Sequence, residues 1–268
     1  MSRELAELTE FAIHTARLAG TEVIMPSYRM ASVEFKADGT EVTEADRDGE
    51  ALIRNRIEAH CPDAAILGEE FGGERSPLAG DQWIIDPIDG TRSFILGVPL
   101  FGTLIGLLRD GEAVLGVMHL PALDETLYAS RGNGCWYGLG GNDPIQVRPD
   151  PIERLDQAFV SVSGVHATEV EPVPGRNVRL APLVQQADRF RVVGDCIQHA
   201  LVCRGRLHLA VDTIMSPWDI AALIPCVEEA GGCVAALDPD SDNITFSGSL
   251  VSAATRPLMQ QAVCLLNG

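Results

Sequence analysis

Residues 83–91 read WIIDPIDGT, an apolar run followed by two aspartates that lie three positions apart around a proline. The apolar run predicts a buried strand and Gly90 predicts a turn, but neither explains two acids where the strand ends. Pro87 has no N–H and fixes its own φ, which favours placing Asp86 and Asp89 on one side of a tight bend. Gly90 permits close backbone approach, and the TRSFI that follows can begin a helix whose free amides face an anion. We therefore expect this stretch to supply both metal ligands and a cradle for phosphate.

Acids stand at three other places along the chain, and a simpler explanation is open for each. Asp46 in TEAD and Asp219 in SPWD each lie three residues after Thr or Ser, which is the spacing of a helix capping box. Glu69 and Glu70 in ILGEE also fit solvated loop acids, and Asp89 fits an Asp-Gly turn. Taken together, however, carboxylates without a neighbouring histidine or thiol are the ligand set of a hard divalent cation, Mg²⁺ first. The combined pattern favours a magnesium site.

Size and charge limit the possible partners. The chain has 268 residues, 46% of them hydrophobic, and a formal net charge of −18. This length and apolar content predict one globular domain spanning residues 1–268. Nucleic acid and anionic membrane have the same sign of charge as the chain, which argues against both as partners. An anionic substrate would be repelled as well, so a phosphate substrate would require bound metal.

The sequence favours a cytoplasmic location. No apolar run approaches the roughly 20 residues needed to cross a bilayer. Residues 1–20 have an acidic amphipathic pattern rather than a basic segment followed by an apolar signal core. The seven cysteines are scattered without a C-x-x-C pair, which indicates reduced thiols, and the histidines show no zinc-binding spacing.

Apolar periodicity predicts alternating helices and strands along the chain. A helix is expected from Leu5 to Ala19, before Pro26, and the glycine-rich residues 131–144 are expected to form a loop. The other expected helices are residues 43–64, 181–189, 196–205, 216–232 and 256–266. The expected strands are residues 64–70, 83–87, 101–130 with turns at RDGE and PALDE, 158–164, 190–194, 206–212, 233–237 and 249–254. This alternation predicts an α/β fold in which helices are layered on mixed sheets.

Several phosphatase chemistries do not fit the spacing of these motifs. A haloacid-dehalogenase-type site needs a nucleophilic Asp two residues before a second Asp on an early strand, whereas the spacing here is three and the motif begins at residue 86. The chain has neither the histidine-rich signature of a polymerase-and-histidinol-type metal hydrolase nor a C-x₅-R loop. A metal-activated water that attacks phosphorus in line is the chemistry that remains.

Four stretches resemble, in order and at comparable separations, the motifs of the inositol monophosphatase family of metal-dependent, lithium-sensitive phosphatases. They are ILGEE, WIIDPIDGTRSF, GVPLFGTLIGLL and PWDIAALIPCVEEAGG. The resemblance covers essentially the whole chain and is nearest to the histidinol-phosphate phosphatase branch, because of DGTRSFILGVPLFGTLIGLL and VGDC. It implies an alternating αβαβα sandwich with mixed sheets, with the metal site in roughly residues 1–150 and the substrate pocket completed by residues 151–268. It also implies a homodimer.

The same resemblance implies two to three Mg²⁺ ions per active site. A first ion would be held by Glu69, Asp86 and the Ile88 carbonyl, a second by Asp86, Asp89 and Asp219, and a looser third would lean on Glu69. The residues with implied catalytic roles are Glu69 and Thr91, which would orient the attacking water, and Asp46, which would lie close to Thr91. The amides of Gly90 and Thr91 would receive the phosphate.

The resemblance leaves the substrate open between two phosphate monoesters. The residues implied to contact the substrate, besides Gly90 and Thr91, are Asp89, Gly194, Asp195, Cys196, Asp212 and Asp219. Asp195 and Asp212 would suit a cation, and L-histidinol has an ammonium and an imidazole that can be protonated. A carboxylate accepting two hydroxyls would serve inositol equally well.

Two residues depart from the histidinol-phosphate branch, since Ile197 stands where an aromatic residue is expected and Trp218 where tyrosine is common. We expect a Mg²⁺-dependent histidinol phosphatase, with an inositol-1-phosphate phosphatase as the alternative. A catalytically silent member and a bisphosphatase have less support, because no expected ligand is lost and no Arg/Lys cluster suggests a second phosphate site. Lys36 and Arg92 are expected on the solvated surface rather than at the edge of the site.

Overall fold

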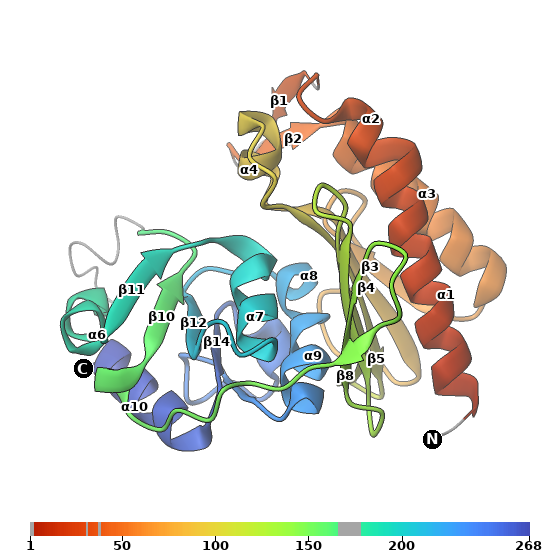
Figure 1. The fold of residues 1–268 in the computed structure, drawn as a ribbon. Coiled ribbons are helices and arrows are strands. Elements are labelled where there is room, and N and C mark those ends of the chain that lie inside the picture. The colour runs from red at the N-terminus through yellow and green to blue at the C-terminus, as the bar shows by residue number, and fades with distance from the viewer. Residues whose placement is uncertain (1–2, 31, 37–38, 166–177) are drawn as a thin grey trace.

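Five layers of secondary structure, alternately helical and sheet, make up the fold (Figure 1). The computed structural model describes residues 3–30, 32–36, 39–165 and 178–268. The layers confirm the expected αβαβα sandwich, and both main sheets mix parallel and antiparallel pairs. Each sheet is covered on both faces, so its central strands, such as β5 (Gly102–Arg109) and β12 (Leu209–Asp212), are buried almost throughout rather than alternating.

The first layer consists of helices α1 (Arg3–Ala19) and α3 (Glu44–His60), which cover one face of the larger sheet. The helix α1 continues through a π-helical turn, η1 (Gly20–Ile24), into the short α2 (Met25–Ser27). The apolar stripe expected for α1 is buried, as the side chains of Leu5, Leu8, Ala12, Ala16 and Ala19 show. A capping box begins α3, and the helix ends two residues before Pro62, which fits the early stop that a proline causes.

The larger sheet has seven strands in the order β3-β4-β5-β6-β7-β8-β9. The pair β3 and β4 is parallel and the other neighbours are antiparallel. Its strands are β3 (Ala65–Gly68), β4 (Asp81–Asp89), β5 (Gly102–Arg109), β6 (Glu112–Leu120), β7 (Glu125–Ser130), β8 (Cys135–Leu139) and β9 (Ile145–Gln146).

The smaller sheet has five strands in the order β11-β10-β12-β14-β13. The central strand β10 runs parallel to both β11 and β12, and β14 is antiparallel to β12 and β13. Its strands are β10 (Phe159–Val162), β11 (Arg189–Val192), β12 (Leu209–Asp212), β13 (Cys233–Ala235) and β14 (Leu250–Ala253). The single turn η2 (Leu155–Gln157) precedes β10 in the chain, and the single turn η3 (Ile244–Phe246) precedes β14.

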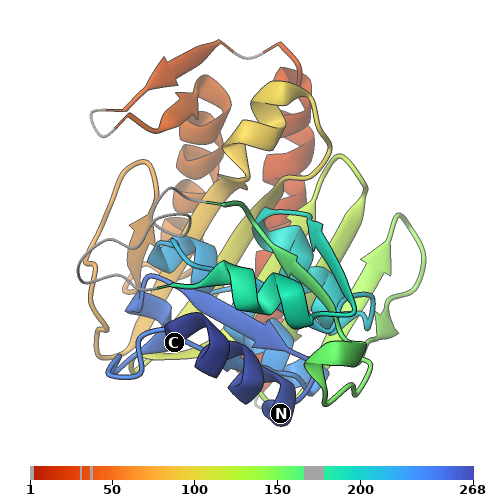
Figure 2. The ribbon, with the colours of Figure 1, turned by 90° about the vertical axis from the view of Figure 1, so that its left-hand side faces the viewer.

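Helices of the second half form the middle and last layers. Between the sheets lie α7 (Asp195–Cys203), α8 (Pro217–Ile220) and α9 (Leu223–Ala230), whose apolar side chains share a core with the larger sheet. The outer face of the smaller sheet is covered by α6 (Leu180–Gln186) and α10 (Arg256–Asn267), which lie in front in Figure 2. No helix in the described ranges is long and apolar enough to span a membrane.

The expected loop over residues 131–144 is wrong in its middle, where the chain forms β8. This strand pairs with β7 and β9, and its first residue, Cys135, is fully buried. The glycines that suggested a loop mark the turns instead, because Gly132 and Gly134 have positive φ values of 79° and 73° just before the strand. The expected helix over 216–232 is likewise divided into α8 and α9.

A hairpin of β1 (Val33–Phe35) and β2 (Glu41–Thr43) projects beside α4 (Thr91–Leu96) at the top of Figure 1. Below it, the end of β4 meets the first residues of α4, α7 and α8 around one cavity. Ser163, which directly follows β10, and Asp212, the last residue of β12, line the opposite side of the same cavity.

Candidate active site

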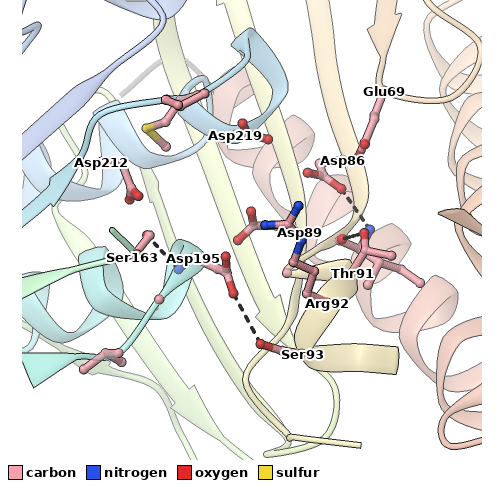
Figure 3. A pocket seen from close by; sticks show the side chains of 17 residues that line it. Glu69, Asp86, Asp89, Thr91, Arg92, Ser93, Ser163, Asp195, Asp212 and Asp219 are labelled. Atoms are coloured by element: carbon pink, nitrogen blue, oxygen red, sulfur yellow. Dashed lines mark hydrogen bonds between the residues drawn. The ribbon is translucent and has the colours of Figure 1, made fainter. Parts of the chain in front are cut away.

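The DPIDG segment forms an irregular strand end that turns two carboxylates toward one cavity. The pairing of β4 with β5 shifts register between Asp86 and Asp89, which is a bulge in the ladder. The Ile88 amide donates to Asp86 Oδ1 at 2.9 Å, and the Thr103 hydroxyl donates to the Pro87 carbonyl at 2.9 Å. These bonds fix the segment, so both aspartates line the cavity shown in Figure 3.

Three acids converge closely enough to share a cation. Asp86, Asp89 and Asp219 each offer one carboxylate oxygen, and these oxygens lie within 4.8 Å of one another. Glu69 lines the same cavity. Burial, together with the charge of Glu69 and its aspartate neighbours, raises the pKa of Asp86 well above its usual value, and burial raises that of Asp219 to about 7. An all-oxygen donor set under such mutual repulsion fits a hard divalent cation, so the residues present suit the ion that the sequence predicts.

The capping acids belong to this site as well as to their helices. The Thr43 amide donates to Asp46 Oδ2 at 2.7 Å at the start of α3, and the Ser216 amide donates to Asp219 Oδ2 at 2.6 Å at the start of α8. Both capping boxes are therefore present. The simpler explanation and the functional one are compatible, because capping uses Oδ2 and leaves Oδ1 for other partners.

Thr91 lies between two acceptors at the start of α4. Its hydroxyl oxygen is 3.3 Å from Asp46 Oδ1 and 3.1 Å from the Ile88 carbonyl oxygen. The structure thus brings Asp46 next to Thr91 and the Ile88 carbonyl. A hydroxyl has one proton, so Thr91 can donate fully to only one of these acceptors at a time. Its oxygen lone pairs and the cavity side of the hydroxyl stay open to a substrate or water.

Lys36 lies at the site, and the expectation that it is solvated is wrong. Its ammonium is 2.8 Å from Glu69 Oε1 and 2.7 Å from Glu70 Oε1, and only 22% of the side chain is exposed. Burial raises the pKa of Glu70 to about 7. Arg92 is 73% exposed and pairs with Glu41 at 3.2 Å, which confirms the expected surface position, although it also lines the cavity rim.

The second half of the chain supplies the other wall of the cavity, whose volume is about 380 Å³. Asp195 begins α7 with a left-handed φ of 49°, and its amide donates to Ser163 Oγ at 2.9 Å. Burial and the neighbouring charge of Asp212 raise the pKa of Asp195 to about 6. Gly90 has a left-handed φ of 84°, and a side chain there would begin 2.8 Å from Asp195 Oδ2 and 3.0 Å from the Leu100 carbonyl oxygen, so a glycine is favoured where the two walls meet.

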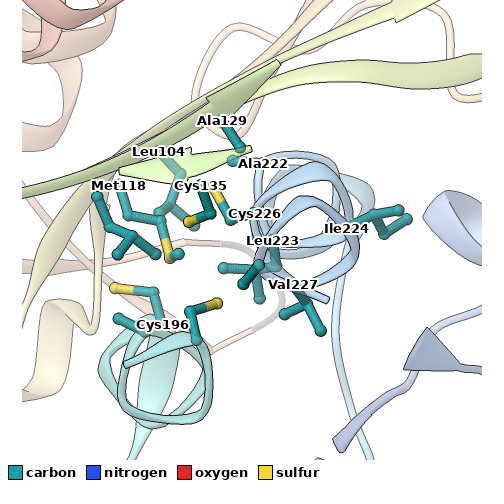
Figure 4. Close-up of a cluster of buried hydrophobic side chains, with 14 of the residues drawn as sticks. Leu104, Met118, Ala129, Cys135, Cys196, Ala222, Leu223, Ile224, Cys226 and Val227 are labelled. Carbon is teal, nitrogen blue, oxygen red and sulfur yellow. The ribbon is translucent and has the colours of Figure 1, made fainter. Parts of the chain in front are cut away.

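Cys196 is the exception among the residues expected to contact substrate. It is not among the described residues that line the cavity, and its thiol is buried in the core between the larger sheet and α7 (Figure 4). Its backbone amide instead donates to Asp89 Oδ2 at 2.6 Å. The role of Cys196 in this structure is therefore to tie the start of α7 to the DPIDG segment.

Sequence reasoning missed six cavity residues, which are Ser93, Ser163, Gly164, Val193, Ile214 and Met215. Two of them, Ile214 and Met215, give the far wall an apolar part, and Ser93 donates to Asp195 Oδ2 at 3.4 Å. Ser163 could have been found, because it follows a strand that was expected and β10 lies parallel to β12, which ends in Asp212. Parallel strands that pair place their carboxyl ends at one edge, so the residues after them meet.

Comparison with known proteins agrees with this geometry. The family model described as "Inositol monophosphatase family" matches residues 4–267. The chain is 48% identical over 207 residues to a histidinol-phosphatase of Chlorobaculum parvum, covering 76% of each chain. It is 38% identical over 206 residues to a histidinol-phosphatase of Mycobacterium tuberculosis, covering 77% of this chain and 78% of that one.

A solved structure of an IMPase from Thermotoga maritima has the same fold, with a TM-score of 0.83 at 31% identity over 97% of both chains. The acidic cluster, the layered fold and the full-length match lead to one assignment. The chain belongs to the inositol monophosphatase family.

Proposed function

We propose that the protein hydrolyses L-histidinol phosphate to L-histidinol and phosphate. Family membership makes it a phosphatase of phosphate monoesters. The observation that supports the particular substrate is the pair Asp195 and Asp212, which line the cavity outside the cluster of metal-binding acids. Two carboxylates free of metal suit an alcohol with an ammonium and an imidazole. Two relatives named histidinol-phosphatase support the same choice.

The donor set of the first half would hold two to three Mg²⁺ ions. The residues we propose as ligands are Glu69, Asp86, the Ile88 carbonyl, Asp89 and Asp219. When bound, the ions supply an activated water and neutralise charge on the phosphate. Since the chain has a net charge of −18, cation binding at these acids also gives an anionic substrate an attractive site.

The residues around the cluster position the substrate and move protons. The first amides of α4, at Gly90 and Thr91, have no acceptor within their own helix and would donate to phosphate oxygens. Thr91 Oγ1 accepts a proton from the attacking water when it passes its own to Asp46 Oδ1, at 3.3 Å. Glu69, which lines the same cavity, would hold the same water.

At the other wall, Asp195 and Asp212 would bind the alcohol portion of the substrate, with Gly194 allowing it to approach the backbone. Asp89 and Asp219, which line the same cavity, would lie at its phosphate end. Charged groups that are paired across a partly buried cavity discriminate strongly against analogues that lack the charge. The substrate would thus be oriented with its phosphate toward α4 and its cations toward the smaller sheet.

Phosphate release tests this assignment. Purified protein with Mg²⁺ is assayed on L-histidinol phosphate, inositol 1-phosphate and a nucleotide 3′,5′-bisphosphate, each with a chelated control. We expect the highest kcat/KM for L-histidinol phosphate and no release after chelation. Release from L-histidinol phosphate no faster than from the other compounds would contradict the proposed substrate.

Inositol 1-phosphate is the second candidate substrate. Asp212 has one carboxylate oxygen without a partner among the described residues, and a carboxylate can accept bonds from two neighbouring hydroxyls. The similarity to the Thermotoga maritima IMPase supports this reading. A higher kcat/KM for inositol 1-phosphate than for L-histidinol phosphate would establish it.

Finer properties follow from the family resemblance and are part of the proposal. We propose Mg²⁺ as the working ion, inhibition by lithium, a homodimer and a cytoplasmic location. The seven cysteines are all free thiols, which agrees with a reducing compartment. Light scattering of the protein as it elutes from a size-exclusion column tests the dimer, activity titrations with Mg²⁺ and Li⁺ test the two ion effects, and cell fractionation tests the location.

A further inference from the structure

A buried polar network lies directly behind Asp212. Its Oδ2 accepts one hydrogen bond from Gln198 Nε2 at 2.6 Å and contacts His199 Nε2 at 2.8 Å. The other ring nitrogen, His199 Nδ1, contacts the Ser252 hydroxyl at 2.8 Å. Gln198, His199 and Ser252 have no exposed surface, whereas Asp212 lines the cavity. The network therefore connects a substrate-facing carboxylate to the core of the smaller sheet.

The contacts determine which way the carboxylate faces. Both of them fall on Oδ2, and no described residue donates to Oδ1. With Nε2 protonated, neutral His199 donates to Asp212 and accepts from Ser252, so each ring nitrogen is satisfied. Hydrogen bonds to a carboxylate are short and strong when the donors are shielded from water, and they hold the carboxylate in one orientation. Oδ1 is thus held toward the cavity as an acceptor.

Gln198 extends this control to a second residue of the same wall. Its amide nitrogen is also 2.8 Å from Ser163 Oγ, which accepts in turn from the Asp195 amide at 2.9 Å. Ser163, Asp195 and Asp212 are the polar residues that the smaller sheet and α7 present to the alcohol end of the cavity (Figure 3). One buried turn of α7 therefore positions all three.

The order Ser252, His199, Asp212 is that of a serine hydrolase triad, but a nucleophilic role is excluded by placement. Ser252 lies on β14, is fully buried and is not among the described residues that line the cavity. A nucleophile must reach the phosphorus atom, and the hydroxyl has no path to it. The network acts by positioning.

We propose that His199, assisted by Gln198, is a specificity-determining positioning residue that aims Asp212 Oδ1 at the alcohol portion of the substrate. The inference rests on the proposed function for the identity of that alcohol, which carries a cation. Whatever the alcohol is, His199 acts through Asp212 on its recognition and does not affect phosphate binding or hydrolysis. A phosphate ester without hydroxyl or cationic groups should not depend on it.

The test compares three substrates in His199→Leu, in His199→Gln and in the wild-type enzyme. L-Histidinol phosphate and inositol 1-phosphate have alcohols that Asp212 can bind, and p-nitrophenyl phosphate does not. For His199→Leu we expect KM for the preferred alcohol substrate to rise by about ten- to hundredfold, as for loss of a hydrogen bond to a charged group. The kcat and KM for p-nitrophenyl phosphate should stay within about twofold. In His199→Gln the side-chain amide can replace Nε2 as donor, so most of the loss should be rescued.

Two further variants separate positioning from general destabilisation. His208 is also a buried histidine, and it does not line the cavity. Its Nδ1 accepts a hydrogen bond of 2.7 Å from the Phe159 amide. His208→Leu should lower the melting temperature and leave substrate preference unchanged. Ser252→Ala removes only the hydroxyl that contacts His199 Nδ1, so it should shift substrate preference in the same direction as His199→Leu but by less. It replaces His199→Leu in the test if that variant does not fold.

The outcomes distinguish this inference from the proposed function. If the wild-type enzyme prefers inositol 1-phosphate and His199→Leu loses that preference selectively, the substrate assignment is wrong and the positioning role stands. If His199→Leu lowers kcat/KM for all three substrates equally, or changes none, the positioning role is overturned whichever substrate is preferred. In an Asp212→Asn background the His199 substitution should cause no further loss of preference, and an additive loss would also overturn the role.

Discussion

The hydroxyl of Thr91 contacts both Asp46 and the Ile88 carbonyl, and in the proposed reaction it would pass a proton from water to Asp46. For Thr91→Ala we expect kcat to fall by about a hundredfold or more, the usual effect of losing a proton-transfer group, with little change in Mg²⁺ affinity. Initial rates at saturating Mg²⁺ and calorimetric titration of Mg²⁺ measure the two quantities separately. Weakened Mg²⁺ binding with normal kcat at saturation would remove Thr91 from this role.

Asp89 lies in the acidic cluster with Asp86 and Asp219, and its Oδ2 accepts a hydrogen bond of 2.6 Å from the Cys196 amide. In Asp89→Asn the amide oxygen can still accept from Cys196, so we expect the fold to be kept and the melting temperature not to fall. The negative charge is lost, so Mg²⁺ binding and activity should fall strongly. The exposed Asp188→Asn variant is the control for charge alone. Near wild-type turnover of Asp89→Asn at saturating Mg²⁺ would show that Asp89 is not a ligand.

The acids of the cavity could be predicted from the sequence because each follows a strand end or a capping signal. Glu69, Asp86, Asp89 and Asp219 reach one cavity for that reason. Lys36 could not be placed, since it follows a short exposed strand without an apolar pattern, and its ion pairs join it to residues more than thirty positions away. The roles assigned to these residues stay predictions until the variants are measured.

Among the elements, α8 and α9 approach the larger sheet at a pair of glycines. Gly106 and Gly116 face each other across β5 and β6, and a side chain at Gly116 would begin 2.0 Å from the Ala222 carbonyl oxygen. Backbone atoms cannot give way as a flexible side chain can, so Gly116→Ala should destabilise the protein by about 1–3 kcal/mol or more. Thermal unfolding measures the loss.

Gly141→Ala is the matched control, because nothing lies within 4 Å of a side chain added there. Since Asp219 lies on α8, displacement of this helix should also weaken Mg²⁺ binding in Gly116→Ala. An unchanged melting temperature would mean that the two helices can shift without cost.

The segment after β1 holds Lys36 against Glu69 and Glu70, so its ammonium contacts a proposed metal ligand. A divalent ion at Glu69 must compete with that ammonium. For Lys36→Gln we therefore expect Mg²⁺ to bind several-fold more tightly, measured by calorimetry in the absence of substrate. Arg47 on α3 pairs with Glu34 on β1, the strand that precedes Lys36. Arg47→Gln removes this ion pair and should leave the affinity for Mg²⁺ unchanged. Weaker Mg²⁺ binding in Lys36→Gln would show that the lysine supports the site instead.

Most helices and strands could be predicted because their apolar spacing matches the faces they bury, as in α1 and in the strands β4 to β6. The strand β8 could not, since its five residues are enclosed by glycines that form its turns. Its pairing depends on β7, a neighbour that no local pattern identifies. Tertiary pairing of this kind overrides local propensity.

For the whole molecule, the buried acids couple stability to pH. The pKa of Asp219 is raised from 3.8 to about 7 and that of Asp195 to about 6, chiefly by burial. Carboxyls with raised pKa values bind protons more tightly in the folded state than in the unfolded state. The free energy of unfolding of the metal-free protein should therefore fall as pH rises from about 4 to about 7, by up to about 1.4 kcal/mol per pH unit per proton.

Melting temperatures in chelator across this pH range test the coupling. Added Mg²⁺ should restore stability most at the upper end, where the acids are charged. Asp89→Asn should show a shallower dependence on pH than the wild type. A melting temperature that rises with pH in chelator would contradict the predicted sign.

The five layers could be predicted from the alternation of elements together with the family resemblance, and the structure confirms them. What the alternation could not supply is the pairing within each sheet, such as the parallel pairs that bring Ser163 beside Asp212. Those pairs join residues about fifty positions apart. The division into parts near residue 150 stays a prediction.

The two sheets contribute to the cavity unequally. Except for Asp219, the acids that would bind metal come from the larger sheet and its flanking segments, whereas Ser163 and Asp212 come from the smaller sheet and Asp195 from α7. The residues that we propose for hydrolysis and those that we propose for recognition of the alcohol would therefore be able to change separately during evolution, apart from the contact of the Cys196 amide with Asp89. A lineage would then acquire a new substrate by exchanging a few residues of α7, of β12 and of the end of β10 while the acids proposed as metal ligands stay the same.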